Sequence, residues 1–95
     1  MYASIRKYKS SNTAETIKRV NEGFVPIISQ ARGFVAYYLV DGGGGSLASV
    51  SLFETQAGAD ESNRLAADWV KANLAALTAG PPEITAGEVA AAKTR

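Results

Sequence analysis

Four consecutive glycines, Gly42–Gly45, separate two apolar segments in the middle of the chain and constrain its fold more than any other feature. The segment 34–40 is apolar at both alternating sets of positions, which is typical of a strand covered on both faces. The segment 46–54 alternates instead, and Ala48, Val50 and Leu52 share one of its faces. Two strands joined by a short glycine-rich connection predict an antiparallel hairpin.

The register of this hairpin decides which side chains share a face. If the four glycines form the loop, Asp41 lies opposite Ser46 and Phe34 lies opposite Phe53. The face of Phe34 then also carries Tyr38 and the alternate residues of the segment 46–54, namely Leu47, Ser49, Ser51 and Phe53. A single bulge in either strand would exchange the two faces.

The segment 2–9 predicts a further strand at the start of the chain. Ala3 and Ile5 share one face, and the other face carries Tyr2, Ser4, Arg6 and Tyr8. If the apolar Ala3 and Ile5 face the helices, Arg6 points to the opposite side of the sheet.

A helix is expected after this strand, because Asn12 and Glu15 have the three-residue spacing of a capping box. Apolar residues then recur at helical steps: Ile17, Val20, Phe24, Ile27 and Ala31. Pro26 lies inside this stripe, where a proline removes one backbone hydrogen bond and clashes with the preceding turn. We therefore expect a kink or a restart near Val25.

A second helix is predicted from a Thr55 cap to about Leu77. Its apolar face would consist of Leu65, Ala66, Trp69, Val70, Leu74 and Leu77. The sequence Gly80-Pro81-Pro82 ends this helix, and the segment 83–91 predicts a weaker fourth strand before a frayed end.

The predicted order is strand, helix, strand, strand, helix, strand, which is typical of an α+β, ferredoxin-like βαββαβ sandwich. The 95 residues fit a single domain spanning 1–95. In this register Phe34, Tyr38, Phe53 and Leu47 lie on the side of the sheet that the helices leave open. An apolar face of that size predicts a partner surface, and a second copy of the chain is its simplest cover.

Composition excludes several classes of protein. The chain has no cysteine and no histidine, so we expect no disulfide, no zinc finger, no metal site and no histidine-ligated haem. The net charge of +1 argues against a nucleic-acid partner. No apolar run reaches the roughly 18 residues that a membrane span requires, and we expect a cytoplasmic protein without a membrane partner.

Four segments together resemble the dimeric α+β barrel superfamily, closest to the antibiotic-biosynthesis-monooxygenase-like (ABM-like) domain. They are the strand Tyr2–Tyr8, Gly33-Phe34-Val35-Ala36-Tyr37-Tyr38, Ser51-Leu52-Phe53-Glu54, and Asp68-Trp69-Val70-Lys71. The resemblance implies a homodimer in which two sheets form a barrel, with a pocket in each subunit between sheet and helices. Members of this superfamily include cofactor-free oxygenases, haem-degrading enzymes, isomerases and many small proteins without a defined role.

The haem-degrading members of the superfamily share the Trp69 context but ligate haem through a histidine about ten residues later. The corresponding stretch here, Leu77-Thr78-Ala79-Gly80, has no histidine, and Lys7 falls near the position of their first-strand asparagine. We therefore expect no haem and no other cofactor. A cofactor-free oxygenase needs a base, and in this chain the base would be a carboxylate, Lys7 or a tyrosine, unless the substrate is acidic enough by itself.

The residues expected to bind a ligand are Arg6, Tyr38, Ser51, Asn63 and Trp69. A guanidinium beside serine hydroxyls and Tyr38 is suited to hold a carboxylate or a phenolate. Three of these residues also have a purely structural interpretation: Arg6 pairs with an acid across the dimer, Trp69 fills the core, and Asn63 lies at a solvated helix edge.

Two functions remain open at this stage, because fold does not determine function. The first is a cofactor-independent, monooxygenase-like enzyme with a pocket for a small aromatic ligand. The second is a non-catalytic ligand-binding or stress-associated dimer. An RNA-recognition domain shares the same element order, but it requires stacking aromatics on the first and third strands, a pattern that the third strand lacks.

Overall fold

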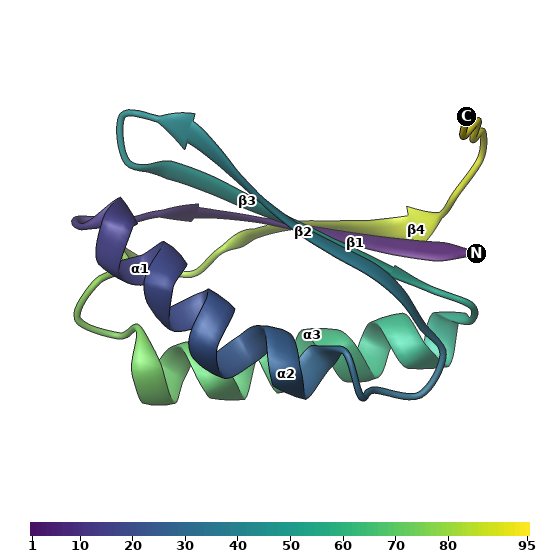
Figure 1. Ribbon diagram of the computed structural model, residues 1–95, viewed down its shortest axis with the longest axis horizontal. Coiled ribbons are helices and arrows are strands. Elements are labelled where there is room, and N and C mark those ends of the chain that lie inside the picture. The colour runs from purple at the N-terminus through teal and green to yellow at the C-terminus, as the bar shows by residue number, and fades with distance from the viewer.

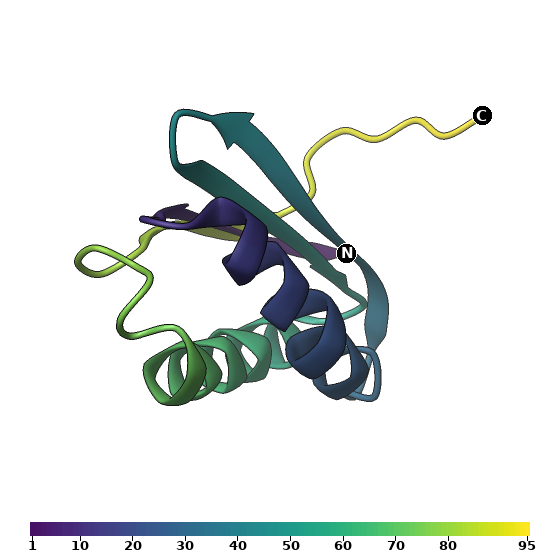
Figure 2. The same ribbon diagram turned by 60° about the vertical axis from the view of Figure 1, so that its left-hand side comes forward.

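The computed structural model describes all 95 residues as one four-stranded antiparallel sheet with its helices on a single face (Figure 1). The strands are β1 (Tyr2–Lys9), β2 (Phe34–Gly43), β3 (Ser46–Phe53) and β4 (Glu83–Glu88), in the sheet order β2-β3-β1-β4. With the helices between β1 and β2 and between β3 and β4, this is the predicted α+β ferredoxin-like fold. The turned view in Figure 2 shows the helical layer packed beneath the sheet.

The helix after β1 is interrupted as predicted. It consists of α1 (Thr13–Arg19), a π-helical segment η1 (Val20–Phe24) and α2 (Val25–Ile28), which has Pro26 in its first turn. Asn12 caps α1 by accepting a hydrogen bond from the Glu15 backbone N–H at 3.1 Å.

The extra residue in the π-turn changes which side chains face the core. The buried positions are Thr16, Val20, Phe24 and Ile28, whereas Ile27 of the predicted stripe is 43% exposed. A π-turn widens the helical repeat, so positions after it no longer follow the spacing of an α-helix.

The second helix, α3 (Gln56–Asn73), begins at the predicted cap, where the Thr55 hydroxyl accepts a hydrogen bond from the Gly58 N–H. It ends four residues before the predicted Leu77. Its buried positions are the small residues Ala59, Ser62 and Ala66, which allow the helix to approach the sheet closely.

The predicted hairpin is present, but its register shifts near Val35. Phe34 pairs with Phe53 as expected, and beyond a bulge Ala36 pairs with Leu52 and Tyr38 pairs with Val50. The shift exchanges the two faces of β2 over most of its length. The expectation that Tyr38 shares a face with Ser49 and Ser51 is therefore wrong, and Tyr37 takes that place.

The side of β1 that meets the helices also differs from the expectation. Ser4 and Arg6 are 1% and 4% exposed and face the helices, whereas Ala3 and Ile5 lie on the other side of the sheet. Leu47 and Phe53 likewise face the helices and belong to the buried interior, and Phe34 packs against Phe53. Of the four residues expected on the side that the helices leave open, only Tyr38 lies there. The side away from the helices, called the reverse face below, carries Ala3, Ile5, Ala36, Tyr38, Val40, Ala48, Val50 and Leu52.

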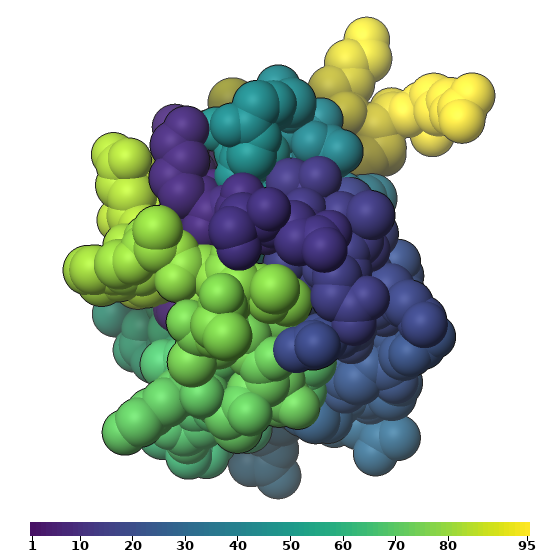
Figure 3. Space-filling model, turned by 90° about the vertical axis from the view of Figure 1, so that its left-hand side faces the viewer, coloured from purple at the N-terminus to yellow at the C-terminus, as the bar shows by residue number.

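The last strand, β4, is shorter than the predicted segment 83–91. The chain beyond Glu88 forms no further strand or helix and projects from the body of the molecule (Figure 3). None of the helices combines the length and apolar character needed to cross a membrane.

Candidate functional site

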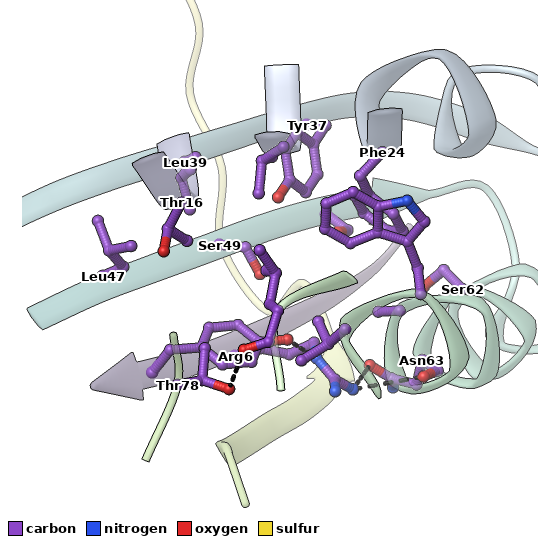
Figure 4. Close-up of a pocket in the computed structure, with 17 residues that line it drawn as sticks. Arg6, Thr16, Phe24, Tyr37, Leu39, Leu47, Ser49, Ser62, Asn63 and Thr78 are labelled. Atoms are coloured by element: carbon purple, nitrogen blue, oxygen red, sulfur yellow. Dashed lines mark hydrogen bonds between the residues drawn. The ribbon is translucent and has the colours of Figure 1, made fainter. Parts of the chain in front are cut away.

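A cavity lies between the sheet and the helices and is the candidate site (Figure 4). Its wall is formed by side chains from β1, β2, β3, α1, η1 and α3. The open space is about 30 Å³, which is room for one or two water molecules. A larger ligand therefore requires lining side chains to move.

One wall of the cavity is aromatic. The Phe24 ring lies 5.6 Å from the Tyr37 ring in an edge-to-face arrangement and 5.4 Å from the indole of Trp69, measured between ring centroids. Trp69 is partly buried, and its indole N–H makes no hydrogen bond within the chain. Gly23 in the π-helical segment leaves room for this indole, since a Cβ at Gly23 would lie 3.0 Å from Trp69 Cζ2.

The opposite wall holds a polar cluster of Arg6, Tyr8 and Asn63, and Ser4 supports it from outside the cavity. Arg6 Nε donates to the Tyr8 hydroxyl at 2.6 Å, and Arg6 Nη1 donates to Asn63 Oδ1 at 3.3 Å and to the Asn63 carbonyl oxygen at 3.4 Å. The Ser4 hydroxyl donates to the same Oδ1 at 2.6 Å. These bonds join β1 to α3 and hold the guanidinium in the cavity wall, as Figure 4 shows for Arg6 and Asn63.

No carboxylate lines this cavity. Lys7, a candidate base, lies on the reverse face opposite Ala48 and so cannot reach the cavity. The titratable groups that remain beside Arg6 are the phenols of Tyr8 and Tyr37. Burial raises the pKa of Tyr37 to about 12 and nearby Tyr8 adds to the rise, while the Ser49 hydroxyl and the charge of Arg6 act in the opposite direction. Tyr37 is therefore a hydrogen-bond donor at neutral pH and not a base.

The structure brings together four of the five residues expected to bind a ligand. Arg6, Ser51, Asn63 and Trp69 line the cavity, whereas Tyr38 is 59% exposed on the reverse face. Sequence reasoning missed Tyr37 as a lining residue, because the bulge at Val35 is not visible in the sequence pattern. No group of three or more histidine, cysteine, aspartate or glutamate residues is placed to hold a metal ion.

Comparison with known proteins finds similarity in structure alone. No family model matches the sequence, and no curated protein matches it. A protein of unknown function from Nitrosomonas europaea, NE2512, superposes with a TM-score of 0.78 at 21% identity, over 99% of this chain and 93% of that chain. The monooxygenase ActVA-Orf6 of Streptomyces coelicolor, solved in complex with nanaomycin D, superposes with a TM-score of 0.77 at 14% identity, over 99% and 91%.

A dimeric ferredoxin-like protein from an uncultured marine organism also superposes, with a TM-score of 0.73 at 12% identity over 100% of both chains. The resemblance to ABM-like proteins expected from the sequence is thus confirmed at the level of the fold. At these identities the likeness concerns the fold alone, and the chemistry of the cavity must be argued from its own residues.

Proposed function

We propose that this chain is a homodimeric α+β barrel protein whose helix-side cavity binds a small aromatic compound and oxidises it as a cofactor-independent, monooxygenase-like enzyme. The observation that carries the proposal is the cavity itself, with three aromatic rings on one wall and a buried guanidinium on the other. The resemblance to the fold of a monooxygenase solved in complex with the ligand nanaomycin D supports it.

The aromatic wall suits a flat ligand, because aromatic rings pack favourably in stacked or edge-to-face arrangements. The open space of about 30 Å³ is smaller than any aromatic ring system. Trp69 can be displaced at a cost in packing, since no hydrogen bond holds its indole N–H and the side chain is only partly buried. We expect its ring to swing outward as the ligand enters.

The chemistry proposed for the cavity uses the acidity of the substrate, because the protein offers no carboxylate, histidine or lysine base there. A substrate that ionises to an enolate or phenolate supplies the electrons for O₂ itself. In the balanced overall step an activated ring CH₂ and O₂ give a ring C=O and water, and the substrate is the only reductant. Arg6 would stabilise the ionised oxygen.

One observation favours the alternative of a non-catalytic ligand-binding dimer. Tyr37 holds its proton far above neutral pH, so the cavity lacks an obvious proton acceptor. Under this reading the same cavity binds the aromatic compound without converting it.

The homodimer is proposed from the reverse face of the sheet. Tyr38 and Val40 are 59% and 52% exposed there, beside further apolar residues. The accessible surface of the chain is 5995 Å², which is larger than the roughly 5,200 Å² expected for a monomer of this mass. The projecting tail contributes part of this additional surface. A second copy packed on the reverse face would cover these side chains.

Anthrone provides a direct test, because oxidation of its ring CH₂ by O₂ gives anthraquinone and water. We expect O₂ consumption and anthraquinone formation in equal amounts with the purified protein, and a loss of about tenfold or more for Arg6→Met. Arg64→Met is the matched control, since Arg64 lies on the exposed side of α3 and pairs only with Glu61 and Asp68. Binding without O₂ consumption would favour the non-catalytic alternative. The absence of both binding and O₂ consumption would contradict the proposal.

A further inference from the structure

Arg6 is a buried cation without an acidic partner. It is 4% exposed, and the three ion pairs of the chain all involve Arg19 or Arg64 instead. Arginine stays protonated in proteins, and a buried charge is normally paired. An acid from a second copy packed on the reverse face would not reach Arg6, because the guanidinium lies on the helix side of the sheet.

The hydrogen bonds around Arg6 leave only donors unused. Nε and Nη1 are engaged, whereas Nη2 makes no hydrogen bond. Because arginine can only donate, Asn63 must turn its Oδ1 towards Arg6, and its amide Nδ2 then remains free. The Tyr8 oxygen accepts from Arg6 Nε at 2.6 Å, so the Tyr8 O–H proton points elsewhere.

Two of these donors are not fully enclosed. No fully enclosed side-chain nitrogen or oxygen in the structure lacks a hydrogen-bond partner, and Arg6 Nη2 and Asn63 Nδ2 have none. Arg6, Tyr8 and Asn63 all line the cavity, and the cavity contains one formal positive charge and no negative one. The complement of such a site is an anionic oxygen that accepts several hydrogen bonds.

We propose that the cavity selects aromatic ligands that carry an ionised oxygen acid, either a carboxylate or an ionised phenol or enol, anchored on Arg6 Nη2 with Asn63 Nδ2 and Tyr8 O–H as further donors. This inference rests on the proposed aromatic cavity and names the class of ligand that it accepts. The acidic oxygen lies against the polar cluster, and the ring packs against the aromatic wall.

Three small probes separate the ionised ligands from a neutral one. Benzoate carries a carboxylate, pentafluorophenol is ionised at neutral pH, and benzamide is a neutral analogue of benzoate with nearly the same shape. Trp69 is the only tryptophan of the chain and lines the cavity, so its fluorescence reports binding directly. Calorimetry provides an independent measure of affinity.

We expect benzoate to bind about tenfold or more tightly than benzamide, because hydrogen bonds to charged groups are stronger than neutral ones. Arg6→Met should abolish the difference, and Arg64→Met should preserve it. If benzoate binds more tightly than pentafluorophenol, the natural acid is a carboxylate. If pentafluorophenol binds more tightly than benzoate, the natural acid is a phenol or enol, and either result supports the inference.

If neither benzoate nor pentafluorophenol binds the native protein more tightly than benzamide, the inference is overturned and the aromatic cavity still stands. Binding of none of the three probes would contradict the proposed cavity as well. The comparison of probes needs only the native protein, so the inference remains testable even if Arg6→Met fails to fold.

Discussion

The contact between Gly23 and Trp69 allows a quantitative test of how the aromatic wall is built. An alanine Cβ at position 23 would lie 3.0 Å from Trp69 Cζ2 and 3.4 Å from its Nε1, closer than ordinary contacts. Gly23 has no positive φ, so its backbone accepts an alanine. In a helix, replacing glycine by alanine stabilises by about 1 kcal/mol, whereas overpacking costs about 1–3 kcal/mol. We expect Gly23→Ala to lower the free energy of unfolding by about 1 kcal/mol.

A double-mutant cycle separates the two contributions. In a Trp69→Phe background the larger ring is absent, so Gly23→Ala should instead stabilise by about 1 kcal/mol, a coupling of about 2 kcal/mol between the two sites. Urea unfolding followed by circular dichroism gives all four free energies without relying on tryptophan. The same effect of Gly23→Ala in both backgrounds, within about 0.5 kcal/mol, would refute the contact.

Three further predictions concern other parts of the structure. Gly58→Ala should destabilise by about 1–3 kcal/mol, because its Cβ would lie 2.9 Å from the Arg32 carbonyl oxygen and 3.0 Å from Phe53 Cδ1. Gly87→Ala, with no neighbour within 4 Å, is the control, and equal shifts of the melting temperature in the two variants would contradict the packing. Spectrophotometric titration should show Tyr37 ionising near pH 12. Because its pKa is raised in the folded state, stability should fall by about 1.4 kcal/mol per pH unit from pH 10 to 12, and ionisation of all tyrosines near pH 10 would refute this. Val50→Lys, central on the reverse face, should shift the mass in light scattering from dimer to monomer, and an unchanged mass would argue against that interface.

Features set by local signals were predictable from the sequence. The caps at Asn12 and Thr55 form as expected, because each depends on one side chain and a backbone N–H three residues away. The break near Val25 follows from Pro26, whose ring cannot continue a helix. With the hairpin these signals fix the order of elements and therefore the fold.

Features set by tertiary contacts were not predictable. The bulge at Val35 exchanges Tyr37 and Tyr38 between faces, and nothing in the local sequence marks it. The face of β1 was misassigned because the apolar Ile5 looked like the buried side. Arg6 is buried instead, since Asn63, 57 positions further along the chain, accepts its hydrogen bonds.

The residues of the site were partly predictable for a related reason. Arg6, Asn63 and Trp69 stood out by residue type and by the resemblance to the ABM-like domain. Their meeting in one cavity depends on the packing of α3 against β1, which the sequence does not encode locally. Tyr8 was visible as a neighbour of Arg6, but its role as acceptor of the Nε hydrogen bond required coordinates.

A crystal structure of the protein with bound benzoate tests the location and chemistry of the site most directly. The account predicts the carboxylate within hydrogen-bond distance of Arg6 Nη2 and the ring against Phe24 and Trp69, with the indole displaced outward. Benzoate bound on the reverse face, or a cavity that stays closed at saturating benzoate, would contradict it.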